Sequence, residues 1–215
     1  MFRFAGLVPF LLLGCTDTEP SEADNPYDAF WSNLSSHCGQ AYDGNLVSSD
    51  EVDAAFRDAD MVMHVRECSD SEIRVPFHVR EAGGEWDRSR TWVFTRTDKG
   101  LRLKHDHRHA DGESDAVTMY GGDTSMGGTG RRHSFPVDRE SIEMFQREGL
   151  DASVTNVWTV GVDPAGDPEA RFSYRLQRKQ AGGAPEDRDF RVEFDATKPV
   201  TPPPPPWGST DAPSS

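Results

Sequence analysis

Three histidines stand at every second position near the middle of the chain, and imidazole is a common metal ligand and a side chain that titrates near neutral pH. They are His105, His107 and His109, and they continue a run that begins with Leu101 and Leu103. Residues two apart in a β-strand point to the same face. The spacing therefore predicts a strand whose histidines extend an apolar face toward a polar rim.

One interpretation of this face is a metal site. His105 and His107 could share a Zn, Ni or Cu ion, and so could His107 and His109. The outer pair is about 13 Å apart by strand rise, so all three cannot bind one ion in regular strand geometry. A third ligand has to come from elsewhere, and the candidates are His64, His78, His133, Asp111 and Glu113. Two other interpretations stay open: a small-molecule pocket lined by the three histidines, and histidines that only satisfy hydrogen bonds.

The histidines belong to the second strand of a hairpin predicted over residues 91–109. Asp98-Lys99-Gly100 fits a three-residue loop with glycine in the left-handed position. That loop pairs Thr97 with Leu101, and it places Trp92 and Phe94 on the charged face of the hairpin. A loop of two residues would move both aromatic side chains to the histidine face, because a slip of one residue reverses the faces.

Most of the chain from residue 61 onward shows the same period of two. We count about ten short strands and no alternation of strands with helices, which favours an antiparallel sheet. Two helices are expected, one starting at Asn25-Pro26 and one at Asp138, where the residue types suit helix N-caps. We therefore predict a mainly β protein: an antiparallel barrel with two packed helices, with a β-sandwich as the alternative.

The first residues have the pattern of an export signal. Arg3 precedes the apolar run 4–13, which is too short to span a membrane as a helix. The run ends in Leu12-Leu13-Gly14-Cys15, which resembles the lipobox of bacterial lipoproteins. The resemblance implies a signal peptide over residues 1–14, lipid attachment at Cys15, and a flexible tether over residues 15–24. It also implies a location in the bacterial cell envelope, on the outer membrane facing the periplasm. The alternative is an ordinary secretory signal with an incidental cysteine.

Export changes the interpretation of the other two cysteines, because the periplasm is oxidising. Cys38 and Cys68 are an even pair and predict a disulfide. Two free buried thiols are the alternative, and a metal site is disfavoured because the chain has no CxxC spacing.

Composition and net charge limit the extent of the folded domain and the kinds of partner it can have. The folded part is expected to be one domain over residues 25–198, followed by a disordered Pro-rich tail over residues 199–215. The chain carries 23 Lys and Arg against 37 Asp and Glu, a net charge of −14. Nucleic-acid binding needs a basic surface, so this balance argues against such a partner. We expect a monomer whose partners are the membrane, through its lipid, and a small molecule.

Signals of catalysis are weak. The stretch 123–127 lacks the first glycine of a nucleophile elbow, and the stretch 127–130 lacks the Lys of a P-loop. We expect a ligand-binding envelope lipoprotein rather than an enzyme. A metal-dependent hydrolase that uses zinc on the histidines and a structural or interaction protein are the alternatives.

Two resemblances accompany this interpretation. The Gly39–Gly44 stretch is similar to the start of calycin barrels such as lipocalins and nitrobindins, with Tyr42 where those proteins usually have Trp. From about residue 30 to residue 200 the chain resembles an uncharacterised family of bacterial secreted proteins and lipoproteins. That resemblance supplies no functional residues, and it lies in the stretches 62–66, 91–94, 103–109 and 117–122.

Overall fold

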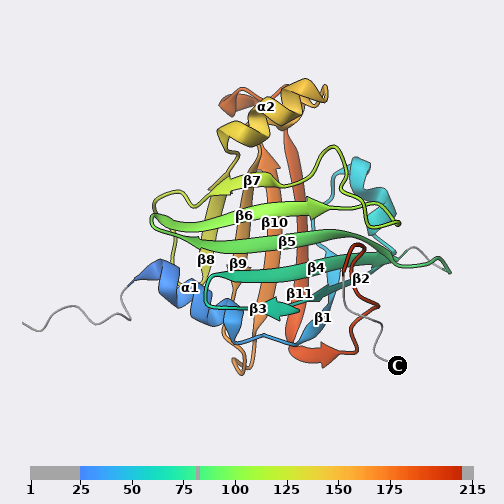
Figure 1. Cartoon of the computed structure of the whole chain (residues 1–215), viewed down its shortest axis with the longest axis vertical. Coiled ribbons are helices and arrows are strands. Elements are labelled where there is room, and N and C mark those ends of the chain that lie inside the picture. The colour runs from blue at the N-terminus through green and yellow to red at the C-terminus, as the bar shows by residue number, and fades with distance from the viewer. Residues whose placement is uncertain (1–24, 81–82, 210–215) are drawn as a thin grey trace, which may run out of the picture.

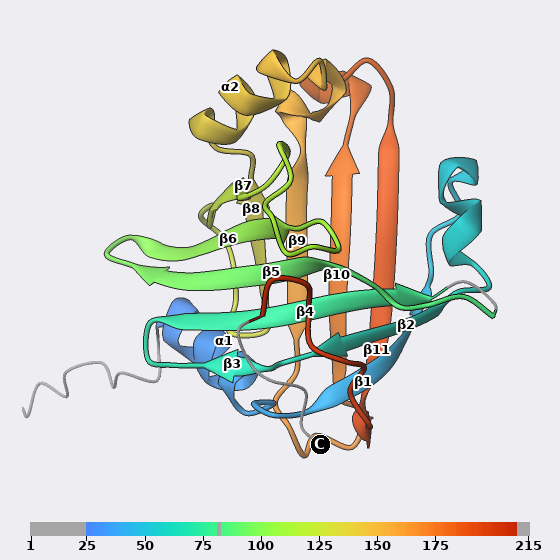
Figure 2. The ribbon, with the colours of Figure 1, turned by 45° about the vertical axis from the view of Figure 1, so that its right-hand side comes forward.

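The computed structural model describes residues 25–80 and 83–209. The expected signal peptide, Cys15 and the tether lie outside the described residues. The described chain forms one antiparallel sheet whose strands follow the order β7-β6-β5-β4-β2-β1-β11-β10-β9-β8, with β3 added beside β4. These ten strands make a nearly closed barrel, so the predicted barrel is confirmed (Figures 1 and 2). The strands are β1 (Ala41–Leu46), β2 (Asp60–His64), β3 (Glu67–Cys68), β4 (Glu72–Arg80), β5 (Asp87–Thr97), β6 (Gly100–His107), β7 (Tyr120–Asp123), β8 (Arg132–Pro136), β9 (Val157–Val162), β10 (Arg171–Arg178) and β11 (Arg188–Val200).

Two glycines let the barrel close. A Cβ on Gly121 would lie 1.9 Å from the carbonyl oxygen of Leu103, and one on Gly122 would lie 1.8 Å from that of Pro136. No side chain fits at either position, and glycine allows this close approach of backbones. The first and last strands of the sheet are joined near this point by the bond from Ser125 N–H to the Ser134 carbonyl.

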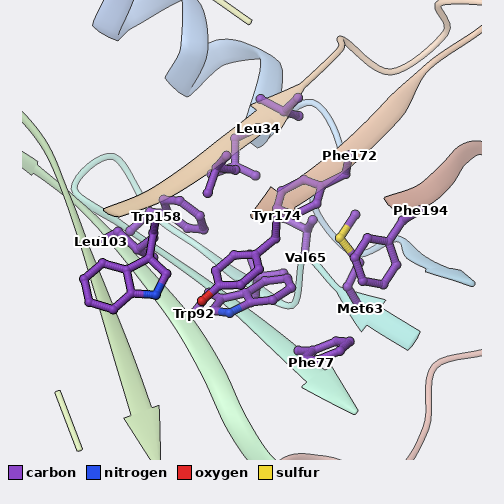
Figure 3. Packing of buried hydrophobic residues seen from close by; sticks show 14 of the residues in the cluster. Leu34, Met63, Val65, Phe77, Trp92, Leu103, Trp158, Phe172, Tyr174 and Phe194 are labelled. Carbon is purple, nitrogen blue, oxygen red and sulfur yellow. The ribbon is translucent and has the colours of Figure 1, made fainter. Parts of the chain in front are cut away.

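The core fills the barrel, and strands such as β11 show the alternation of inward apolar and outward polar residues that directs side chains into it. Trp92 lies at its centre, stacked on Phe77 at 5.0 Å and on Tyr174 at 4.5 Å between ring centroids. Figure 3 shows these rings converging from different strands. Phe172 and Phe194 complete the aromatic cluster and are fully buried.

The two expected helices are present. Helix α1 (Pro26–Ser35) starts at Asn25, whose side chain accepts a hydrogen bond from the Tyr27 N–H. It packs against the end of the barrel where the β5–β6 turn lies, since Phe30 reaches Phe94 there (Figure 1). Helix α2 (Arg139–Arg147) is capped by Asp138. Three short 3-10 helices lie between strands: η2 (Glu51–Phe56), η3 (Asp151–Thr155) and η4 (Gln180–Gly182).

The predicted disulfide is present between Cys38 and Cys68, whose Cα atoms are 6.3 Å apart. It joins the segment after α1 to β3. Among the described residues no helix is long and apolar enough to cross a membrane.

The described part of the C-terminal tail, residues 199–209, differs from the disordered segment predicted over residues 199–215, whose last six residues lie outside the described part of the chain. Strand β11 continues to Val200, and residues 201–209 cross the outer face of β4 and β5 (Figures 1 and 2). The Arg88 side chain donates to the Pro205 carbonyl at 2.6 Å, and the Trp207 N–H donates to the Arg88 carbonyl at 3.1 Å. Proline has no backbone N–H group that must find an acceptor. A Pro-rich segment can therefore lie on a sheet with few backbone hydrogen bonds.

Candidate functional site

The turn of the histidine hairpin decides which side chains meet inside the barrel. Thr97 pairs with Gly100, so only Asp98 and Lys99 form the loop, and the three-residue loop was wrong. The register moves by one residue and places Trp92 opposite His105. Trp92 and Phe94 therefore share the inner face with the histidines, as the two-residue alternative requires, and do not lie on the charged side.

His105 is fixed by a complete set of hydrogen bonds. Its Nδ1 lies 3.0 Å from the Tyr120 carbonyl oxygen, and its Nε2 lies 2.8 Å from the Tyr174 hydroxyl. A carbonyl can only accept, so Nδ1 carries the proton and Nε2 accepts from the Tyr174 O–H. Burial lowers the pKa of His105 to about 3, which keeps the ring neutral, in agreement with this pattern. His105 therefore orients its neighbours and has no free nitrogen.

His107 lies one step nearer the barrel mouth and is less buried. Its Nε2 is hydrogen-bonded to the Tyr120 hydroxyl at 3.0 Å, and Arg90 is its partner across the hairpin. Burial, followed by the nearby Arg90 charge, lowers the pKa of His107. Burial also raises the pKa of Tyr120 to about 12, so its hydroxyl keeps its proton. The result is a wall of uncharged rings beside one guanidinium.

These side chains line a half-open cavity of about 190 Å³ at the end of the barrel opposite α1. Its inner wall is aromatic, and its polar groups gather toward the mouth. A cavity of this order accommodates a single aromatic ring, because an engineered cavity of about 150 Å³ binds benzene. The lining residues are Asp53, Phe56, Phe77, Arg90, Thr91, Trp92, His105, His107, Tyr120, Tyr174, Leu176, Arg188 and Phe190.

The 3-10 helix η2 contributes Asp53 and Phe56 to one side of the cavity lining. Phe56 packs edge-on against Phe190 at 5.3 Å, and the buried carboxylate of Asp53 accepts two bonds from the Arg188 guanidinium. Coordination of both carboxylate oxygens by one guanidinium gives a directional contact. This short helix is therefore tied to β11 at the rim of the cavity.

The backbone beside the cavity is strained at one position. Met119 has a φ of 54°, the only positive φ of a non-glycine residue within the described parts of the chain. Its N–H donates to the His105 carbonyl at 2.6 Å, and it directly precedes Tyr120. Such conformations persist where the surrounding structure enforces them, and they concentrate at functional sites.

His109 does not join the other two histidines. Strand β6 ends at His107, and the His109 side chain is 58% exposed, with Asp115 at 3.8 Å. The prediction that all three line one pocket is therefore wrong for His109. After His107 the chain leaves the cavity and enters a turn at Gly112, whose N–H donates to the His109 carbonyl.

The described residues contain no group of three or more His, Cys, Asp or Glu side chains that could hold a metal ion. His105 has both nitrogens engaged, and the expected third ligands lie elsewhere. His133 stacks on Tyr27 at the α1 end, and the Asp111 carboxylate accepts from the Glu113 N–H in an exposed turn. His64 and His78 belong to β2 and β4 and are not among the residues that line the cavity. The donor set thus does not fit a zinc ion.

A larger hollow of about 570 Å³ lies on the outside of the barrel, between the Gly-rich segment 125–131 and the strands β8 to β11. Its floor is open because Gly161 has no side chain and Ser173 has a short one. It lacks the aromatic wall and the buried polar network of the smaller cavity. We therefore place the candidate site at the barrel mouth.

Comparison with protein-family models and with curated proteins found no match for this chain.

Sequence patterns identified His105 and His107 and missed most of their partners. Arg90, Tyr174 and Arg188 come from three strands and converge only in the closed barrel. One sequence signal was present: Tyr174 alternates with Phe172 and Leu176, which marks it as an inward residue. No sequence spacing connects it with His105, 69 positions away.

Proposed function

We propose that this protein is a lipoprotein of the bacterial cell envelope that binds a small, mostly apolar ligand at the mouth of its barrel. The supporting observation is the cavity of about 190 Å³, whose aromatic wall is held by the Trp92, Tyr174 and His105 network. Binding sites of small molecules combine an apolar lining with a few fixed polar groups. The cavity is small, so we expect a ligand of one ring or a short branched chain.

The native ligand can be sought directly. The full-length protein is extracted from membranes of a producing bacterium and analysed by native mass spectrometry, with metal analysis of the same sample. We expect an added mass of a small organic molecule on the intact chain. An extract that carries no added mass, together with no binding in a screen of small aromatic compounds, would leave the binding function without support and favour a structural role.

A matched pair of variants links any binding to this cavity. Leu176→Trp places a larger side chain in the lining of the cavity and should abolish binding. Leu150→Trp makes the same change at a residue that is 39% exposed and outside the cavity, and it should bind like the wild type. Equal loss in both variants would point to unfolding rather than to the cavity.

The envelope location rests on the Leu12-Leu13-Gly14-Cys15 pattern. We expect the mature protein to begin with a lipid-modified Cys15, seen by mass spectrometry of its first peptide. Cys15→Ala should release the protein from the membrane fraction. An unmodified Cys15 in the mature chain would instead indicate an ordinary secreted protein. The partners in this proposal are the membrane, through the lipid, and one small molecule, bound by a monomer.

A further inference from the structure

In the part of the chain that the structure describes, the carboxylate acceptors at the cavity mouth all have partners within the protein, whereas some of the hydrogen-bond donors do not. Both oxygens of Asp53 accept from Arg188. Both oxygens of Asp87 are also engaged, one by the Ser89 N–H and one by Nη1 of Arg90. The acidic groups near the cavity are therefore satisfied by the protein itself.

The donors at the mouth are not all used. Within the described residues Arg90 donates only through Nη1, so Nε and Nη2 are free. His107 uses only Nε2, which leaves Nδ1. The Tyr120 hydroxyl keeps its proton and can donate to Nε2, and the neutral ring of His107 then carries its own proton on Nδ1. Arg90 and His107 lie directly opposite each other on β5 and β6, and both line the cavity. Their free donors therefore lie on the same wall of the cavity.

The interior beyond these donors suits a flat ring. Trp92 and Tyr174 are nearly parallel, with 14° between their planes, and Phe77 extends the same stack with 10° to Trp92. Phe56 and Phe190 line the cavity on the side where η2 lies. Aromatic rings in such surroundings pack against faces and edges with a preference beyond simple burial.

We infer that the ligand is a small aromatic acid, with its ring in the aromatic lining that Trp92, Phe56 and Phe190 share and its carboxylate bound by Arg90 and His107. The inference rests on the proposed function and adds the chemical class of the ligand. A carboxylate offers only acceptors, so it suits a site with free donors. Hydrogen bonds between a guanidinium and a carboxylate are also stronger than hydrogen bonds between neutral groups. Asp87 shares the Arg90 charge, so the acid should bind through the free side of the guanidinium.

The test compares three simple probes on the full-length protein in detergent, followed by the NMR signal of the Trp92 indole. Benzoate has the ring and the carboxylate, benzyl alcohol has the ring alone, and hexanoate has the carboxylate without the ring. We expect benzoate to bind about tenfold more tightly than either of the other two, which is the size of effect expected for one charged hydrogen-bonded contact. The preference should weaken at high salt.

Variants assign the preference to the two residues. Arg90→Gln and His107→Gln should each weaken benzoate binding much more than benzyl alcohol binding, so that the tenfold preference for benzoate falls toward one. Arg102→Gln is the matched control, because Arg102 is an exposed arginine of the same hairpin that pairs with Asp123 outside the barrel. Arg90→Lys keeps the charge and should restore part of the preference. Retained benzyl alcohol binding also shows that a variant is folded.

Equal affinity for benzoate and benzyl alcohol in the wild type would overturn the inference, and the binding function would stand. A preference for benzoate that survives in both Arg90→Gln and His107→Gln would overturn it as well. If no probe shifts the Trp92 signal, the inference fails, and native mass spectrometry of the extracted protein decides separately on the binding function.

Discussion

Trp92 and His105 face each other across the β5–β6 hairpin, at the inner end of the cavity. The Tyr174 hydroxyl, from the opposite side of the barrel, donates to His105 Nε2 at 2.8 Å. His105 therefore links neighbouring strands β6 and β7 to β10 across the interior. This cross-barrel connection gives the site its shape before any ligand arrives.

Tyr174→Phe should destabilise the protein by about 1–3 kcal/mol, because it leaves a buried acceptor on His105 without its donor. Chemical unfolding with a two-state fit measures the change. Tyr27→Phe is the control, since the Tyr27 hydroxyl has no hydrogen bond within the part of the chain described. Equal loss of stability in both variants would argue against the His105 network as the cause.

Stability should fall in mild acid. Burial lowers the pKa of His105 to about 3 and that of His78 to about 4. The unfolded chain then binds more protons than the folded one below about pH 6.5, so the stability is complete above that pH and is lost as the pH falls toward 4. One pKa unit corresponds to about 1.4 kcal/mol, so the total effect is on the order of a few kcal/mol.

Unfolding midpoints at pH 7.5 and pH 4.5 measure this dependence. His78→Leu should flatten it, since the variant removes a buried group that resists protonation. His109→Gln should leave it unchanged, because His109 is exposed. A wild-type midpoint that is the same at both pH values would contradict the prediction.

Asp53→Asn should loosen η2, because Arg188 loses a charged partner that holds this helix to β11. We expect faster amide exchange over residues 51–56, faster exchange of any cavity ligand, and a loss of about 1–3 kcal/mol in stability. Asp58→Asn is the control in the same connection, where the side chain is exposed. Unchanged exchange in Asp53→Asn would show that the other contacts of the helix hold it, namely Asp50 with Arg188 and the Asp189 N–H, and Phe56 with Phe190.

Removal of residues 201–215 should destabilise the barrel by about 1–3 kcal/mol, since the outer face of β4 and β5 loses its cover and Arg88 loses its bond to Pro205. A chain that ends at Ser209 keeps these contacts and is the matched comparison. Thermal unfolding of the two truncated proteins measures the difference. Identical melting temperatures would mean that the segment contributes nothing to the fold.

Reduction of the Cys38–Cys68 disulfide should cost about 3–4 kcal/mol in the chain-entropy account, since the two cysteines are 30 residues apart. Unfolding in the presence and absence of a thiol reductant measures it. Cys38→Ala/Cys68→Ala is the control, because it should not respond to the reductant. A wild type that is equally stable in both conditions would contradict this value.

The patterns that were predicted correctly are local ones. Alternation identified strands such as β10, and the residue types at Asn25 and Asp138 identified both helix starts, because caps and face alternation depend on nearby residues. The hairpin register failed because it depends on one residue in the turn. The docking of residues 201–209 was missed because composition describes the flexibility of a free segment and not the surface that it meets.

Short-range periodicity and residue counts were enough to predict a mainly β barrel, its two helices, the cysteine pair and the inward direction of His105 and His107. The contact of Trp92 with His105, the completion of the cavity by Tyr174 and Arg188, and the position of His109 outside it depend on the closed barrel. Closure of the sheet is the cause. It brings side chains together across the barrel from strands far apart in the chain, and a one-residue change in a turn exchanges the two faces of a strand.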